Sequence, residues 1–125
     1  MIRGVVTAQL EAWIDLDVVG RDDSRIGFSA VIDTGFNGFL TLPHSVLSSL
    51  GCRKLGEALV SLADGSEIQT AVFQVTVFWN GQPRKIEVDA AEVEPLVGMR
   101  MLKGHDVHLQ VVPNGDVTVS PLAIE

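Results

Sequence analysis

The sequence has little from which covalent cross-links or metal sites could be built. Cys52 is the only cysteine in 125 residues, so neither an internal disulfide nor a multi-cysteine zinc site is possible. This usage agrees with a reducing compartment. No apolar run approaches the roughly 18 residues of a membrane span, and Met1 is not followed by a basic flank, an apolar core and a small-residue cleavage site. We therefore expect a cytoplasmic protein with no membrane partner.

Basic residues are also scarce. The 9 Lys and Arg residues are outnumbered by 16 Asp and Glu, which gives a formal net charge of -7. The basic residues are scattered, whereas proteins that bind nucleic acids usually carry a basic patch or stripe. A Gly-rich phosphate loop is missing too. We expect no nucleic-acid partner, and the length fits a single domain, residues 1–125, around one core.

Alternating apolar and polar residues predict an all-β chain of about seven to nine strands. The expected strands, of which the first is long or bent, are 5–19, 26–32, 39–42, 58–62, 67–79, 85–89, 105–112 and 116–120. Type I′ hairpin turns are expected at three dipeptides, Asp64-Gly65, Asn80-Gly81 and Asn114-Gly115. Two short helices are expected within 43–51 and 96–104. Together, these strands, turns and helices predict a small closed barrel or a sandwich.

The stretch from Ala30 to Pro43 is the strongest functional candidate. Three apolar residues, 30–32, run into Asp33-Thr34-Gly35, so a buried strand delivers one carboxylate to a tight turn. A carboxylate at the end of an apolar strand is costly unless it is hydrogen-bonded or paired. That cost marks Asp33 as a candidate functional group. The simpler interpretation is a surface turn, which an isolated Asp-Thr-Gly often forms.

Other reactive residues have simpler explanations. His105 and His108 would be neighbours on a helix, but they lie in predicted loop and strand, so we expect no metal site. Asp15 and Asp17 fit the polar face of an edge strand better than a cation site. Cys52 follows a helix-ending glycine and is better explained as a packed thiol than as a nucleophile. A run of acidic residues between 87 and 94 is predicted to form solvated surface; it consists of Glu87, Asp89, Glu92 and Glu94.

Two motifs together resemble those of the retropepsin-like aspartic proteases. Asp33-Thr34-Gly35 is followed about sixty residues later by Leu96-Val97-Gly98 at the start of a predicted helix. The resemblance extends in element order from 5 to 119. It is strongest to small single-domain members from cellular organisms, whose helix motif is similar to residues 97–102. It implies a small closed β-barrel with two short helices, hydrolysis of a peptide or protein substrate, and no cofactor.

The chemistry of this family requires two carboxylates that share one proton, one acting on a water and the other on the carbonyl oxygen. Because one chain supplies one such motif, the resemblance implies a homodimer in which two copies of Asp33 meet on the two-fold axis. It also implies that Thr34 hydrogen-bonds across the axis and that Gly35 lets its N–H approach the carboxylates. Two close carboxylates cannot both ionise readily, which predicts an acidic to mildly acidic activity optimum.

The resemblance also places a flap at the hairpin turn that contains Leu62, Ala63, Asp64 and Gly65. A flap is a mobile hairpin that closes over an extended peptide and offers it backbone hydrogen bonds. An ordinary surface hairpin explains these residues equally well. Apolar residues beside the turn favour the flap slightly.

Two residues depart from the family pattern. Phe36, which we include among the substrate-binding residues, stands where the family usually has Ala, Ser or Thr, and its ring could reshape the cleft. Arg100 stands where the helix motif usually has an acidic or amide residue. These departures leave open a peptide-binding or dimerisation module that keeps the protease fold without turnover. A third hypothesis is an unrelated small β-barrel, which predicts a monomer with an exposed Asp33 that caps a turn.

Overall fold

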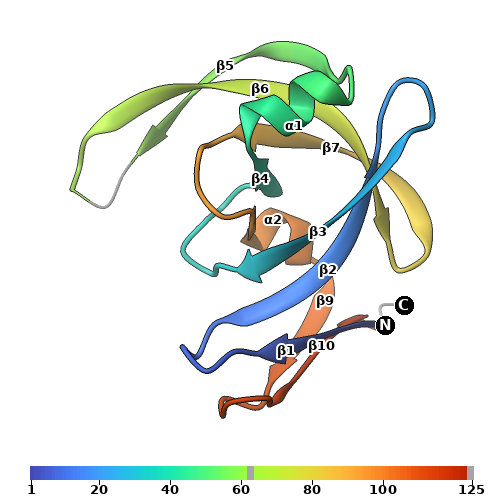
Figure 1. The fold of residues 1–125 in the computed structure, drawn as a ribbon. Helices are drawn as coiled ribbons and strands as arrows, with labels where there is room; N and C mark the ends of the chain where they lie inside the picture. Colours follow the sequence, from blue (N-terminus) through green and yellow to red (C-terminus); the bar gives the residue numbers. More distant parts are fainter. Residues whose placement is uncertain (62–63, 124–125) are drawn as a thin grey trace.

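The structure is a computed structural model that describes residues 1–61 and 64–123, and it consists mainly of β-strands (Figure 1). The strands are β1 (Ile2–Val6), β2 (Ala12–Val19), β3 (Arg25–Ile32), β4 (Leu40–Leu42), β5 (Arg53–Ser61), β6 (Glu67–Trp79), β7 (Gln82–Ala90), β8 (Leu96–Val97), β9 (His105–Leu109) and β10 (Asp116–Pro121). The helices are α1 (His44–Ser49) and α2 (Met99–Leu102). The mainly-β class with two short helices is confirmed. Within the described ranges, no helix is long and apolar enough to cross a membrane.

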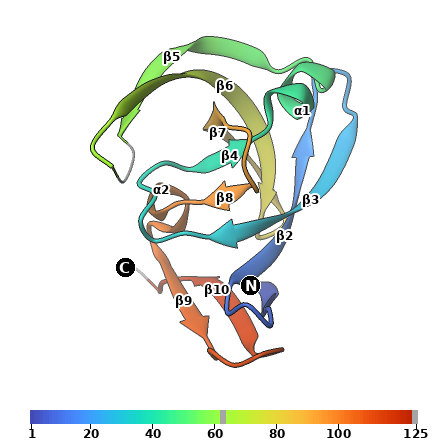
Figure 2. The ribbon, with the colours of Figure 1, turned by 60° about the vertical axis from the view of Figure 1, so that its left-hand side comes forward.

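The strands form one sheet that curls back on itself (Figure 2). Their order is β5-β6-β7-β4-β8-β3-β2-β1-β10-β9, and β2 also pairs with β6. This extra pairing is short and joins Asp17, Val18 and Val19 to residues 76–78. Inward-facing side chains alternate along β2 and are buried against those of the opposite strands, because successive side chains point to opposite faces. These pairings show one sheet that curls on itself. They do not establish the closed barrel that the sequence predicted.

The prediction of a single long or bent strand over 5–19 is wrong, because β1 and β2 are separate strands. The chain turns between β1 and β2, where the Thr7 N–H donates to the Glu11 carbonyl and the Leu10 N–H to the Thr7 carbonyl, both at 2.9 Å. Leu10 has a positive φ of 63°, which a leucine rarely adopts. The turn therefore lacks the Gly, Asn or Asp that usually signals one.

The hairpin turns follow their predicted chemistry in part. Asn80 and Gly81 both have positive φ, at 53° and 77°, as a type I′ turn requires. Asn114 has a φ of 65°, but Gly115 is not among the described residues with positive φ. Gly65 has a φ of 85°, but Asp64 is not among them either, so the type I′ prediction is wrong at both of these turns. Ser61 pairs with Glu67, and this connection is longer than the two residues of a type I′ turn.

Strand β8 brings the two sequence motifs together. It runs parallel to β3, with Val31 opposite Leu96, and antiparallel to β4, with Leu40 opposite Val97. The Leu96 N–H also donates to the buried Thr41 hydroxyl at 3.0 Å. The residues after β3 and those after β8 therefore lie next to each other.

Candidate active site

Asp33 lies directly after β3 and is held by the strand beside it. Its N–H donates to the Val97 carbonyl at 2.9 Å, and the Val31 N–H donates to the Pro95 carbonyl at the same distance. The Asp33 Oδ1 accepts a hydrogen bond from the Gly35 N–H at 2.9 Å, and its side chain is partly buried. The turn thus fixes one oxygen and leaves the carboxylate at the surface of the described chain.

The turn after Asp33 crosses the start of α2 at very short range. A Cβ on Gly98 would lie 2.2 Å from the Gly38 carbonyl oxygen and 2.7 Å from the Phe36 carbonyl oxygen. The Gly98 N–H donates to the Phe39 carbonyl at 3.0 Å, and the Met99 N–H to the Phe36 carbonyl at 2.8 Å. Only glycine permits two backbones to approach in this way. The Leu96-Val97-Gly98 motif therefore supports the turn that carries Asp33.

Thr34 and Gly35 are exposed beside Asp33. A Cβ on Gly35 would lie 3.2 Å from the Asp33 Oδ1, which is tighter than an ordinary contact. The Phe36 ring is partly buried and folds over Gly38, where an added Cβ would lie 2.5 Å from the Phe36 Cζ. The ring therefore packs within its own turn.

The β5–β6 hairpin arches over the turn (Figure 1), and the two line a cleft of about 420 Å³. The wall of this cleft consists of residues 35–39, 58–61, Val72, Glu87, Asp89 and Arg100. Of these, only Gly35 and Phe36 were predicted from the sequence as site residues. Of the predicted flap residues, Asp64 and Gly65 form the exposed turn. Leu62 and Ala63 lie outside the described residues. The hairpin contributes residues of its two strands, 58–61 and Val72, to the cleft wall. The spacing of the sequence motifs did not predict these residues.

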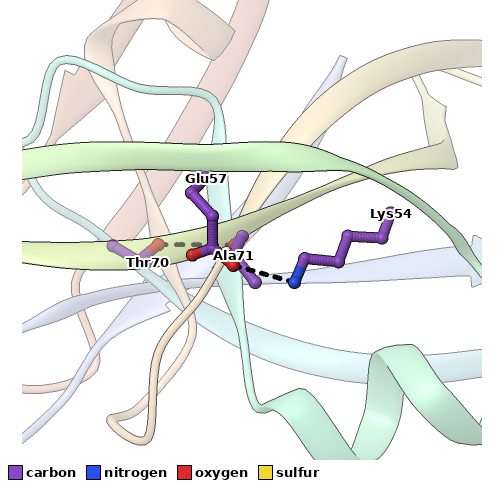
Figure 3. A network of polar contacts seen from close by, with 4 residues as sticks. All are labelled: Lys54, Glu57, Thr70 and Ala71. Carbon is purple, nitrogen blue, oxygen red and sulfur yellow. Dashed lines mark hydrogen bonds and ion pairs between the residues drawn. The ribbon is translucent and has the colours of Figure 1, made fainter.

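The hairpin is held mainly by its backbone ladder. Figure 3 shows Lys54 and Glu57 of β5 beside Thr70 and Ala71 of β6. The Lys54 Nζ lies 2.8 Å from the Glu57 Oε1, and the Thr70 hydroxyl donates to the Ala71 carbonyl at 3.3 Å. An exposed ion pair of this kind contributes at most about 1 kcal/mol. The hairpin therefore depends little on these side chains.

The prediction of solvated acidic surface is wrong for Asp89, whereas Glu87, Glu92 and Glu94 are exposed. The Glu92 carboxylate accepts the His44 N–H at the start of α1, at 3.0 Å. Asp89 is partly buried in the cleft wall. Burial, together with the nearby Glu87 carboxylate, raises the pKa of the Asp89 carboxyl, and the Arg100 guanidinium opposes this in part. Asp89 is brought inward because β7 pairs with β4, where it lies opposite Thr41.

Asp89→Asn should make the protein more stable at neutral pH. Since the pKa of Asp89 is higher in the folded chain than its ordinary value of 3.8, its charge destabilises the fold above the folded pKa and has no such effect below 3.8. We expect a rise in Tm on the order of 1–3 °C at pH 7, because half-solvated charges have modest effects. The difference between the two proteins should vanish near pH 3.5. Thermal unfolding at both pH values measures it, and a variant less stable at pH 7 would contradict the sign.

His105 and Cys52 contribute to the packing. The His105 Nε2 accepts the indole N–H of Trp79 at 2.9 Å, and its Nδ1 lies 3.0 Å from the Lys103 carbonyl oxygen. Indole and carbonyl partners fit the tautomer with the proton on Nδ1. Cys52 packs against the core, and burial raises the pKa of its thiol. Within the described ranges, no group of three His, Cys, Asp or Glu residues could hold a metal ion.

The fold has a known structural counterpart. No family model matches the sequence, and neither does a curated protein. Among solved structures, the crystal structure of a retropepsin-like aspartic protease from Rickettsia conorii matches with a TM-score of 0.56, over 97% of this chain and 91% of that chain, at 15% identity. The chain adopts the retropepsin-like fold.

The retropepsin-like fold confirms the resemblance drawn from Asp33-Thr34-Gly35 and Leu96-Val97-Gly98. A TM-score of 0.56 at 15% identity shows a shared fold alone, so the reaction has to be argued from the residues of this chain. The match over nearly the whole chain argues against an unrelated small barrel.

Proposed function

We propose that this chain is a cytoplasmic aspartic endopeptidase that works as a homodimer on a peptide or protein substrate. The observation that carries the proposal is the placement of Asp33 in a retropepsin-like fold. Its backbone is anchored to Val97, and its carboxylate is oriented by the Gly35 N–H. A cleft of about 420 Å³ lies beside the same turn. No cofactor is needed for this chemistry.

The reaction uses a water held between two copies of Asp33. One carboxylate takes a proton from the water while the other, which is protonated, gives its proton to the carbonyl oxygen of the substrate. The oxygen of the water forms a bond to the carbonyl carbon. When the carbon–nitrogen bond breaks, a proton passes to the leaving nitrogen, and the pair again shares one proton. The Gly35 N–H holds one Asp33 oxygen in place throughout.

The second Asp33 has to come from a second copy. Asp33 and Thr34 lie on the wall of another cleft, of about 430 Å³, whose other wall residues include Leu10, Leu109 and Val111. These three apolar side chains are exposed in the single chain. Exposed apolar residues gathered beside a candidate site indicate an interface. A second copy on this face would cover them and bring its own Asp33 and Thr34 to the axis.

Leu109→Glu should weaken the dimer and the activity together. Leu109 is 44% exposed on this face, and Leu55 is 43% exposed on β5, away from it. A buried unpaired carboxylate disfavours the interface, so we expect at least about a tenfold weaker dimer for Leu109→Glu and no change for the matched Leu55→Glu. Sedimentation at several concentrations measures the dimer. Equal dimer affinities for the two variants would place the interface elsewhere.

The activity itself is tested with purified protein and a peptide library from about pH 4 to about pH 7. We expect cleavage that is fastest in the acidic part of this range. A well-folded dimer that binds extended peptides and leaves them intact at every pH would instead be a peptide-binding module without turnover. That result would contradict the endopeptidase.

A further inference from the structure

The cleft beside the Asp33 turn has a charged end. Of its described wall residues, three are charged: Glu87 and Asp89 from β7, and Arg100 from α2. The wall residues from the Asp33 turn, β5 and β6 carry no charge; they are 35–39, 58–61 and Val72. Glu87 and Asp89 are two positions apart on one strand, so their side chains point to the same face. The part of the wall that comes from β7 and α2, which we call the charged end, therefore has two carboxylates and one guanidinium.

The Asp89 carboxylate lies against the Asp33 turn. Its Oδ2 lies 3.3 Å from the position that a Cβ on Gly38 would occupy. It forms none of the side-chain hydrogen bonds found in the described residues, and neither of the two ion pairs found there within 4.0 Å involves it. The Asp89 carboxylate, which can only accept hydrogen bonds when ionised, thus lies in a partly buried wall of the cleft and has no cation bonded to it among the described residues.

Arg100 does not neutralise this end of the cleft. Its guanidinium carbon lies 6.0 Å from the centre of the Phe39 ring, and it forms no ion pair within 4.0 Å in the described part of the chain. Its contact is with an aromatic face, where a guanidinium is weakly attracted. The three groups together carry one net negative charge.

We infer that Asp89 is a specificity-determining residue, which selects a lysine or arginine side chain of an extended peptide lying in the cleft. The inference rests on the proposed function, because it takes this cleft as the groove for the peptide substrate. A carboxylate in a partly buried wall attracts a cation more strongly than one in open water. An acidic side chain at the same place would face two carboxylates, which rejects it. A neutral side chain would leave Asp89 unpaired.

The position of Asp89 is also unfavourable for the free protein. Because burial raises its pKa, the empty fold disfavours the charged carboxylate, and an amide of the same shape would avoid this effect. A charge that lowers stability and faces a binding cleft fits a role in recognition, since binding sites commonly sacrifice stability. A bound lysine ammonium would remove the penalty.

The test measures peptide binding in an Asp33→Asn background, so that no peptide is cleaved. Fluorescein-labelled octapeptides carry Lys, norleucine or Glu at each position in turn, and fluorescence anisotropy at pH 7 gives the affinities. At one or two positions we expect Lys to be favoured over norleucine by about five- to tenfold, with Glu weakest. Adding Asp89→Asn should abolish the preference. Adding Arg100→Gln, which removes the competing cation, should enlarge it.

The variants separate recognition from a general loss of structure. A structural role would weaken all peptides alike for both Asp89→Asn and Arg100→Gln, whereas recognition predicts opposite changes in the Lys preference. Asp23→Asn removes a carboxylate from the exposed turn between β2 and β3 and should change nothing. Equal affinities for Lys and norleucine at every position, a preference for Glu, or no binding would each overturn the inference.

Hydrolysis of the same peptides by the unmodified protein is measured separately. Preferential binding of Lys peptides without cleavage would keep the role of Asp89 and contradict the endopeptidase. Cleavage without any charge preference would keep the endopeptidase and contradict the role of Asp89.

Discussion

Asp33→Asn is expected to lower kcat for peptide hydrolysis by about 100- to 10,000-fold, the usual contribution of a general acid or base. Asn keeps an oxygen that can accept the Gly35 N–H, as the Asp33 Oδ1 does at 2.9 Å, so the turn should keep its shape. An amide cannot take a proton from water or share one with a second carboxyl group. The measurement is kcat over the acidic range, with circular dichroism and sedimentation to show that fold and dimer are unchanged.

Asp23→Asn serves as the matched control for this substitution. Asp23 has a positive φ of 63°, a conformation that Asn tolerates well, and it is exposed in the turn after β2. It should retain full activity. Equal cleavage by the Asp33→Asn and unmodified proteins would show that any activity arises elsewhere in the preparation or the chain.

Gly98→Ala is expected to destabilise the fold by about 3 kcal/mol, the upper end of the usual cost of overpacking, and to abolish cleavage. The added methyl would lie 2.2 Å from the Gly38 carbonyl oxygen and 2.6 Å from the Phe36 Cδ2. The nearest neighbour is backbone, which cannot rotate away as a side chain does. Relief requires the Asp33 turn and α2 to separate, which breaks the hydrogen bond from the Met99 N–H to the Phe36 carbonyl. Urea unfolding measures the free-energy change.

Gly27→Ala is the matched control, because it adds the same methyl to a glycine of β3. There the nearest atom would be the Asp17 Oδ1 at 3.0 Å, on an exposed side chain that can move. A change within about 1 kcal/mol is expected. If the two alanine variants had equal stability, the close crossing at Gly98 would not be what holds the Asp33 turn.

Local patterns predicted most strands, and they failed where tertiary structure determines the backbone. Alternation identified β3 and β6 because each buries one face and leaves the other polar. The turn at Leu10 was missed because the hydrogen bonds of Thr7 with Leu10 and with Glu11 impose a conformation that leucine does not favour by itself. Turn propensity, which depends on residue type, could not reveal it.

The candidate site shows the same division. Asp33 and Gly98 were predicted from short motifs, because each motif has a local backbone requirement that its residues reveal. Asp89 was missed because its place in the cleft depends on the parallel pairing of β7 with β4, where it lies opposite Thr41. The one available signal was Arg100, whose charge is unusual for the helix motif. Pairing between distant strands is not encoded in the spacing of a few residues.

The most direct test of the central claim is the activity of a mixture of unmodified and Asp33→Asn chains. The two proteins are mixed in equal amounts, subunit exchange is completed, and the rate of peptide cleavage is compared with that of the same total amount of unmodified protein. If each site needs one Asp33 from each of two copies, only dimers with two unmodified chains cleave, and about one quarter of the rate should remain. A remaining rate of about one half would show that each chain acts with its own Asp33, which would contradict the shared site.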